Sequence, residues 1–143
     1  MDKFSPQNIE YHGFTPFNFY YQSLHRINAT IGIAPLVDIR FNEFKSQLKV
    51  LEYGMMGLPV VASDIYPYKL VIENGTNGLL VKNKYVDWYE AIESLILDSE
   101  KRNTFAANLN AKIKDKYNLK TNAKDWENTY LALANSGTNN GTK

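Results

Sequence analysis

Residues 41–63 read FNEFKSQLKVLEYGMMGLPVVAS, a helical pattern of apolar residues that passes through a glycine into a short apolar strand. The spacing predicts an amphipathic helix over Asn42–Met56. Gly57 is typical of the residue just past a helix C-terminus, and the apolar run Pro59–Ala62 predicts a strand covered on both faces. The apolar stripe of the helix consists of Phe44, Leu48, Leu51 and Met55.

The same alternation of short apolar runs and helical periodicity continues on both sides of this stretch. It is typical of βα units, in which helices cover a parallel sheet. The predicted fold class is therefore α/β, with a Rossmann-like parallel sheet. The other predicted strands are Ile9–His12, Thr30–Pro35 and Gly78–Val81, and a helix is predicted over Pro16–Arg26.

Additional C-terminal helices are predicted after the last strand. Asn83, Ser99 and Thr121 are suitable N-cap residues, and each precedes a segment of helical periodicity. Trp88 and Trp126 lie on these helices and are most simply explained as core residues. The three apolar stripes consist of Val86, Tyr89, Ile92 and Ile96; of Phe105, Leu109, Ile113 and Tyr117; and of Ala123, Trp126, Tyr130 and Ala134.

The composition is that of a globular domain, with 143 residues of which 44% are hydrophobic and 13% aromatic. A net charge of +1 gives no bulk attraction to nucleic acid or to an anionic membrane. No cysteine is present, which permits a cytoplasmic location, and no apolar run approaches the roughly 20 residues that span a bilayer. We expect one domain over residues 1–134 and a disordered polar tail over 135–143.

A polar set accompanies the predicted helix over Asn42–Met56. Lys45, Lys49 and Glu52 are spaced so that they share one helix face, beside the apolar stripe. Ser46 lies near the helix start, where backbone N–H groups lack partners, so a diphosphate would fit these donors and Glu52 would accept from a ribose diol. An ordinary solvated face, with Lys49 and Glu52 paired, explains the same spacing. The position between two strands, near the sheet edge where open α/β folds bind ligands, favours the site.

The combined motif resembles the carboxyl-terminal donor-binding domain of GT-B glycosyltransferases of the glycosyl transferases group 1 (family 4) type. The resemblance covers roughly residues 9–117. It implies that the helix holds the diphosphate and ribose of a nucleotide diphosphate sugar, with Glu52 on the ribose. The residues that carry it are Lys45, Ser46, Lys49, Glu52, Tyr53, Gly57, residues 59–63, Tyr68, Ile72, Gly75, residues 78–81 and Trp88.

Two further positions enter through the resemblance. Gly13 follows a predicted strand end that faces the donor cleft in that family, where a glycine permits close backbone approach. Tyr68 lies in the segment after the Pro59–Ala62 strand and is a candidate donor contact. A hydrogen-bonded structural histidine at His12 and a simple aromatic turn at Tyr68 are the alternative explanations.

The chain also departs from the family pattern. The family pairs two glutamates eight positions apart, and the position eight before Glu52 is Phe44. The family's Arg/Lys pair, which neutralises the leaving diphosphate, and its amino-terminal acceptor domain have no counterpart in these residues. We therefore assign no catalytic residue. The resemblance implies neither a metal nor a cofactor besides the donor.

Two functions remain open. The first is the donor-binding domain of a polysaccharide-type glycosyltransferase, which transfers a sugar from a nucleotide sugar when it is part of a complete enzyme. The second is a non-catalytic nucleotide-binding or interaction module. Expected partners are the nucleotide sugar and either an acceptor-domain chain or a second copy of this chain. A phosphoacceptor receiver domain is excluded, because no acidic cluster follows the first strand.

Overall fold

Three short parallel strands form the centre of the protein in the computed structural model, which describes residues 9–137. They are β1 (Gly32–Ala34), β2 (Val60–Ser63) and β3 (Leu79–Val81), in the spatial order β1-β2-β3. Val61 lies opposite Ile33 on one side and Leu79 on the other. The α/β class, the Rossmann-like parallel sheet and three of the predicted strands are thereby confirmed.

The fourth predicted strand, Ile9–His12, is wrong, because this segment has no strand structure. Ile9 and Tyr11 are exposed, so the segment has neither a paired backbone nor a covered face. A strand needs a neighbour for its N–H and C=O groups. The apolar pattern alone does not supply that neighbour.

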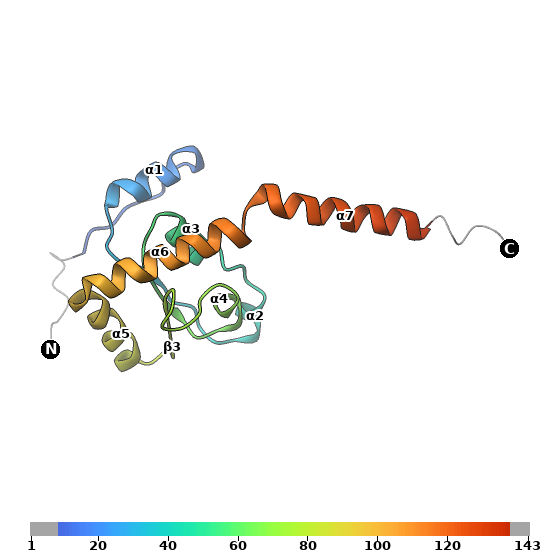
Figure 1. Ribbon diagram of the computed structural model, residues 1–143. Helices are drawn as coiled ribbons and strands as arrows, with labels where there is room; N and C mark the ends of the chain where they lie inside the picture. Colours follow the sequence, from blue (N-terminus) through green and yellow to red (C-terminus); the bar gives the residue numbers. More distant parts are fainter. Residues whose placement is uncertain (1–8, 138–143) are drawn as a thin grey trace.

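The described part of the chain also contains seven helices (Figure 1): α1 (Phe17–Ile27), α2 (Arg40–Glu43), α3 (Leu48–Met55), α4 (Tyr66–Lys69), α5 (Tyr85–Leu97), α6 (Ser99–Lys116) and α7 (Leu119–Gly137). Every residue of β2 is buried, because helices cover both faces of the sheet. One core cluster joins β2 to α3, α4 and α6, and a second joins it to α5 and the first half of α6.

The predicted single helix over Asn42–Met56 is two helices, α2 and α3, with a break between them. The buried Asn42 side chain donates to the Val37 carbonyl at 2.7 Å and so holds α2 against the preceding loop. The break changes the phase of the pattern: Phe44 is 80% exposed, and Val50 and Gly54 make the buried face of α3 instead. The predicted stripe is therefore wrong, although the helical segment and its end are correct.

Gly54 explains why the buried face of α3 was not visible as an apolar stripe. A Cβ at this position would lie 2.7 Å from Leu109 Cγ, so only glycine allows α6 to approach α3 this closely. At the end of α3, Gly57 adopts a φ of 75°, and the N–H groups of Gly57 and Leu58 donate to the carbonyls of Gly54 and Tyr53. This Schellman arrangement confirms the predicted helix end.

The three capping predictions are wrong. Thr121 lies inside α7, which begins at Leu119. Lys84, not Asn83, precedes α5, and Asp98, not Ser99, caps α6 by accepting from the Lys101 N–H at 2.8 Å. The α6 stripe is confirmed by the burial of Phe105, Leu109 and Ile113. The α5 stripe is wrong because the face towards the sheet is Trp88, Ala91, Ile92 and Leu95, whereas Val86, Tyr89 and Ile96 are exposed.

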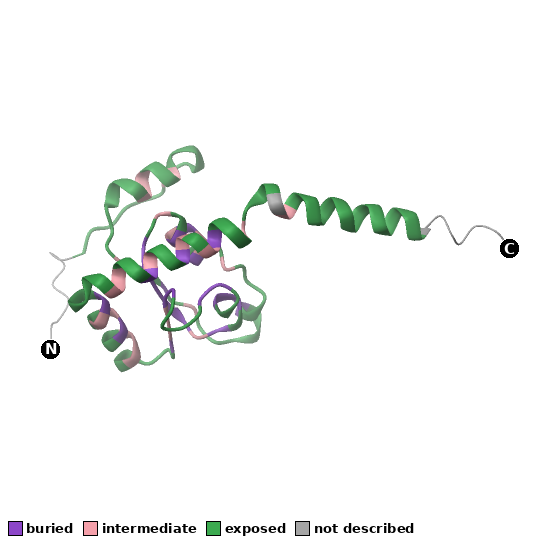
Figure 2. Cartoon of the chain, in the orientation of Figure 1, coloured by how far each residue is buried: buried purple, intermediate pink, exposed green. Residues whose placement is uncertain are grey.

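α1 and α7 lie at the periphery. α1 has no buried residue. α7 extends away from the body of the protein (Figure 1), and its residues are exposed along almost its whole length (Figure 2). Trp126 is 66% exposed, so its predicted place in the core is wrong, whereas Trp88 packs against the second core cluster as predicted. α7 continues to Gly137, three residues into the predicted tail; residues 138–143 lie outside the described residues. Within residues 9–137 no helix is long and apolar enough to cross a membrane.

Candidate functional site

The carboxyl ends of the three strands are joined by a closed set of hydrogen bonds. Ser63, at the end of β2, is fully buried; its Oγ accepts from the Leu36 N–H at 2.8 Å and donates to Asn83 Oδ1 at 2.7 Å. Asn83 Nδ2 donates to the Leu36 carbonyl at 2.8 Å. This Ser63–Asn83–Leu36 ring ties together the segments that follow β1, β2 and β3. The sequence predicts a capping role for Asn83 instead. The signal for the ring is a polar residue at the end of one apolar strand and another two residues after the next strand.

A polar cluster joins α3 to α1. Glu52 is only 8% exposed, and its Oε2 accepts from Lys49 Nζ at 2.9 Å and from the Tyr20 hydroxyl at 3.1 Å. Lys49 Nζ also donates to the Tyr20 hydroxyl. The pairing of Lys49 with Glu52, one helical turn apart, is thus confirmed, and the cluster keeps a nearly buried carboxylate paired with a cation. Tyr20 is a member that sequence reasoning missed, since nothing in the α1 pattern indicates its contact with α3.

The electrostatics of the cluster favour a permanently charged lysine. Burial opposes the charge of Lys49, but its hydrogen bonds to Tyr20 and Glu52 and the charge of Glu52 outweigh burial and raise the pKa of Lys49. Burial raises the pKa of Tyr53 and of Tyr68, and the positive charge of Lys49 opposes both shifts. Lys49 therefore has two further phenols within electrostatic range.

Lys45 and Ser46 lie in the break between α2 and α3, and both are exposed. The Lys45 ammonium lies 5.4 Å from the centre of the Phe41 ring. The predicted common helix face of Lys45, Lys49 and Glu52 is therefore wrong, because Lys45 is outside α3 and the break changes its direction. Ser46 immediately precedes the N-cap of α3, Gln47, as expected for a residue near the helix start.

The two positions that came from the resemblance lie in different surroundings. Gly13 is exposed in the irregular segment before α1, and a Cβ there would meet nothing within 4 Å. It lines a pocket of about 670 Å³ together with His12, Thr15 and Tyr20. Tyr68, in α4, is 5% exposed and packs in the first core cluster. The structure thus brings Gly13 towards Tyr20 and keeps Tyr68 in the core.

Tyr20 connects this pocket to a second one, which contains the Lys49–Glu52 pair. The second pocket has a volume of about 350 Å³ and is lined by Phe14, Thr15, Phe17, Tyr20, Lys49 and Glu52. It combines aromatic walls with one cation and one carboxylate. We take it, with the adjoining Gly13 pocket, as the candidate site.

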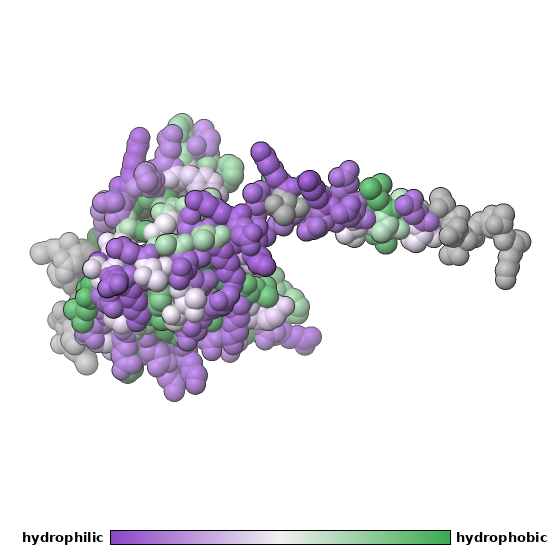
Figure 3. Space-filling model, in the orientation of Figure 1, coloured by the Kyte–Doolittle hydropathy of each residue, from purple (hydrophilic) through white to green (hydrophobic). Residues whose placement is uncertain are grey.

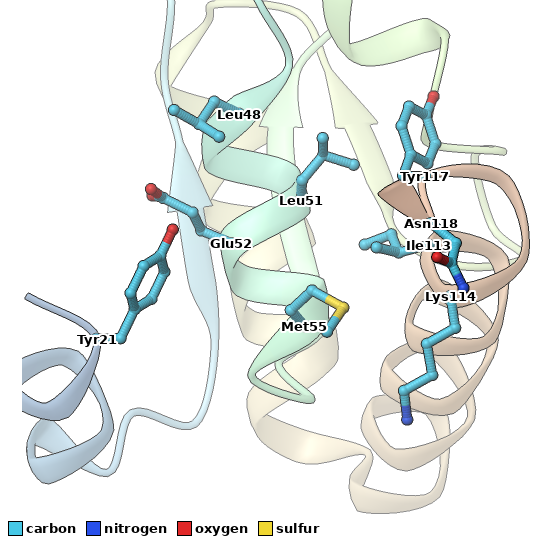
Figure 4. Close-up of a pocket in the computed structure, with 9 residues that line it drawn as sticks. All are labelled: Tyr21, Leu48, Leu51, Glu52, Met55, Ile113, Lys114, Tyr117 and Asn118. Carbon is cyan, nitrogen blue, oxygen red and sulfur yellow. The ribbon is translucent and has the colours of Figure 1, made fainter. Parts of the chain in front are cut away.

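A third pocket lies on the other side of Glu52, between α3 and the end of α6. Its volume is about 590 Å³ and its walls are mainly apolar (Figure 4). Leu48, Leu51 and Met55 of α3 line one wall, and Ile113 of α6 and Tyr117, just after α6, line the other. In residues 9–137 no group of three or more histidine or acidic side chains is arranged to hold a metal ion.

Some solved structures share the fold of this chain. HepE from Anabaena, in complexes with UDP and glucose and with UDP, matches at 24% and 25% identity with TM-scores of 0.58 and 0.56. The matches cover 61% and 58% of this chain and 24% and 23% of HepE. The C-terminal domain of LpcC, a glycosyl transferase group 1 family protein from Francisella tularensis, matches at 22% identity with a TM-score of 0.60, over 76% of this chain and 53% of that domain.

The family of the chain follows from comparison of its sequence, because the solved structures establish the fold alone. No curated protein matches the chain at a significant level, and the chain spans only about a quarter of the length of HepE. A family model, described as glycosyl transferases group 1, matches residues 3–98. This segment includes β1, β2, β3 and the Lys49–Glu52 pair, and it makes up more than half of the chain. The chain is therefore a member of the glycosyl transferases group 1 family.

Proposed function

We propose that this domain binds a nucleotide diphosphate sugar in the candidate site between the segment before α1 and the N-terminal part of α3. The observation that carries the proposal is the nearly buried Glu52 carboxylate, held beside the Lys49 ammonium in the wall of a pocket. A buried carboxylate is costly unless it is paired, and such groups are enriched at functional sites.

The chemistry of the pair fits the polar parts of such a ligand. An ammonium has three donors, of which Lys49 uses two for Tyr20 and Glu52, and the third can donate to a phosphate oxygen. A carboxylate accepts several hydrogen bonds, so Glu52 can also accept from a ribose diol. Lys45 and Ser46 precede the positive end of α3 and supply further donors for an anion.

The remaining predicted positions have smaller roles in the proposal. Gly13 has open space around it and so permits the backbone to approach the ligand closely. Tyr68 is within electrostatic range of Lys49, and its low exposure favours a supporting role over a large contact area. The family membership and the UDP in the HepE complexes support a nucleotide sugar as the ligand.

We extend the proposal to sugar transfer when the domain works with an acceptor-binding partner, domain or chain. In that reaction the diphosphate leaves, and positive charge near it stabilises the developing negative charge. Lys45 and Lys49 would contribute such charge. The alternative is a non-catalytic nucleotide-binding or interaction module.

The test is calorimetric titration of UDP, GDP and ADP into the wild-type chain, Lys49→Ala and Lys124→Ala. Lys124 is exposed on α7, so its replacement removes the same charge without touching the candidate site. We expect one of the nucleotides to bind the wild type and Lys124→Ala equally, and Lys49→Ala to bind it roughly tenfold or more weakly. Equal affinity of the two variants, or no binding of any nucleotide to the wild type, contradicts the proposal.

A further inference from the structure

Tyr20 joins the two charged residues of the candidate site. Its hydroxyl donates to Glu52 Oε2 at 3.1 Å and accepts from Lys49 Nζ. Lys49 Nζ donates to the same Glu52 oxygen at 2.9 Å, so the three groups form a closed triangle of hydrogen bonds. Tyr20 belongs to α1 and stands 32 residues before Glu52 in the sequence. The triangle is therefore a tertiary contact between α1 and α3. In the space-filling view the hydrophobic surface of this part of the molecule is mixed with hydrophilic side chains (Figure 3).

The triangle determines which polar atoms remain for a ligand. Glu52 accepts both of these bonds through Oε2, so neither bond occupies Oε1. Lys49 uses two of its three N–H groups, one for Tyr20 and one for Glu52. One carboxylate oxygen and one ammonium N–H are thus left, which is what a ribose hydroxyl and a phosphate oxygen need.

The hydroxyl of Tyr20 gives this arrangement its direction. The side chain of Lys49 is 53% exposed, and an ion pair with Glu52 on the same helix is compatible with several lysine rotamers. The Tyr20 ring, whose centre is 5.1 Å from Lys49 Nζ, attracts the ammonium without selecting one N–H direction. A hydroxyl that accepts from one member of the pair and donates to the other restricts both.

A purely structural role, in which Tyr20 only attaches α1 to α3, is the simpler explanation. Two observations favour a role in the site. Tyr20 lines both the Gly13 pocket and the pocket that contains Lys49 and Glu52. The core clusters of the described residues include Tyr68 but not Tyr20, so apolar packing does not account for the position of Tyr20.

We propose that Tyr20 is a positioning residue of the candidate site. Its hydroxyl holds Lys49 Nζ and Glu52 Oε2 together, so that the remaining N–H and Oε1 are oriented for a phosphate oxygen and a ribose hydroxyl of one ligand. This inference rests on the proposed function. Tyr20 acts through Lys49 and Glu52 and needs no contact with the ligand. Groups that are already ordered bind more tightly, because less conformational entropy is lost on binding.

The experiment is calorimetric titration of UDP, GDP and ADP into the wild-type chain, Tyr20→Phe and Tyr89→Phe. Tyr20→Phe removes the hydroxyl and keeps the ring, so the contact of the ring with Lys49 is retained. We expect Tyr20→Phe to bind the nucleotide that the wild type binds about fivefold more weakly, which is the loss typical of one hydrogen bond.

Tyr89→Phe is the matched control, because it removes the same kind of bond elsewhere. The Tyr89 hydroxyl donates to Glu93 Oε1 at 2.8 Å on the exposed surface of α5. Tyr89 and Glu93 do not line the two pockets of the candidate site. The nucleotide affinity of this variant should equal that of the wild type.

A second measurement uses the ligand-free chain and reports on Lys49 directly. The exchange of the Lys49 ammonium protons with water is followed by NMR, and the signal is assigned by its absence from Lys49→Met. Exchange should be about fivefold faster in Tyr20→Phe, since one hydrogen bond of the ammonium is lost, and unchanged in Tyr89→Phe. A hydroxyl that acts only by packing would leave this exchange as it is in the wild type.

The outcomes separate this inference from the proposed function. If the wild type binds a nucleotide and Tyr20→Phe binds it equally well, the inference is overturned and the proposed function stands. Unchanged exchange of the Lys49 ammonium in Tyr20→Phe, or an equal loss of affinity in Tyr89→Phe, overturns the inference as well. If no nucleotide binds to the wild type, the proposed function fails and the inference fails with it.

Discussion

α6 and α7 follow each other in the chain, have nearly equal lengths of 18 and 19 residues, and both carry an apolar stripe, yet only α6 is built into the core. α6 buries Phe105, Leu109 and Ile113 against α3 and the sheet, whereas the apolar side chains of α7 are exposed. The two helices differ in whether another element of the chain packs on the stripe: α3 and the sheet pack on α6, and neither core cluster contains a residue of α7. An apolar stripe therefore predicts a face suited to burial, but not which surface covers it.

The largest test of this difference compares equivalent truncations in the two helices. Leu109 is fully buried, so Leu109→Ala should lower the free energy of unfolding by about 2–5 kcal/mol. Leu133→Ala, on α7, should change it by less than about 0.5 kcal/mol under dilute conditions. Urea titration monitored by circular dichroism measures both values. Similar losses in the two variants would mean that α7 packs on its own chain.

The second test addresses the contact that brings α6 into the core. An alanine usually stabilises a helix relative to glycine, but at Gly54 its Cβ would lie 2.7 Å from Leu109 Cγ. We therefore expect Gly54→Ala to destabilise the fold by about 1–3 kcal/mol, as overpacking does. The same titration serves as the measurement. A gain in stability would show that α6 moves freely away from α3.

The third test compares the caps of the two helices. Asp98 accepts from the Lys101 N–H at the start of α6, and Asn118 accepts from the Lys120 N–H at the start of α7. Loss of such a cap costs about 1 kcal/mol of helix stability. Asp98→Ala should therefore lower global stability by about that amount. Asn118→Ala should lower only the helical signal of α7, visible as ellipticity at 222 nm. A global loss from Asn118→Ala would contradict the separation of the two helices.

The smallest effect concerns α1, which has no buried residue but is tied to α3 through Tyr20. Burial opposes the charge of Lys49, but the bonds to Tyr20 and Glu52 raise its pKa above the ordinary 10.5. The stabilisation from Lys49 is therefore complete below that value and declines as the pH rises through the higher folded-state pKa.

The stabilisation from Lys49 is measured as the difference in urea midpoint between the wild type and Lys49→Met. This difference should be constant from about pH 7 to 10 and shrink only above it. Lys124→Met should give no such trend, because Lys124 is exposed on α7. A difference that already declines near neutral pH would contradict a raised pKa for Lys49.

The sheet and most helices could be predicted from sequence because their signals are local. β2 is an apolar run, Gly57 marks the end of α3, and the α6 stripe is regular. The errors arise where a distant residue decides. Whether residues 9–12 form a strand depends on a neighbouring strand. The buried face of α3 depends on Gly54, because the missing side chain at that position lets α6 approach α3 closely.

The candidate site shows the same division. The spacing of Lys49 and Glu52 within one helix predicts their ion pair, and the structure confirms it. The break after α2 separates Lys45 from them, and helical periodicity does not reveal it. Tyr20 enters from another helix and could not be predicted by any spacing.

The Ser63–Asn83–Leu36 ring affects how the carboxyl-terminal edge of the sheet exchanges its amide hydrogens with solvent. The Leu36 N–H lies beyond the end of β1, but its acceptor is a hydroxyl at the end of the fully buried β2. Exchange of that amide with solvent requires its bond to Ser63 to break, so we expect it to exchange more slowly than the amides of the exposed residues that follow. Leu36, in the loop after β1, is thus fastened to the central strand, whereas Val37 and Ile39 beyond it are exposed.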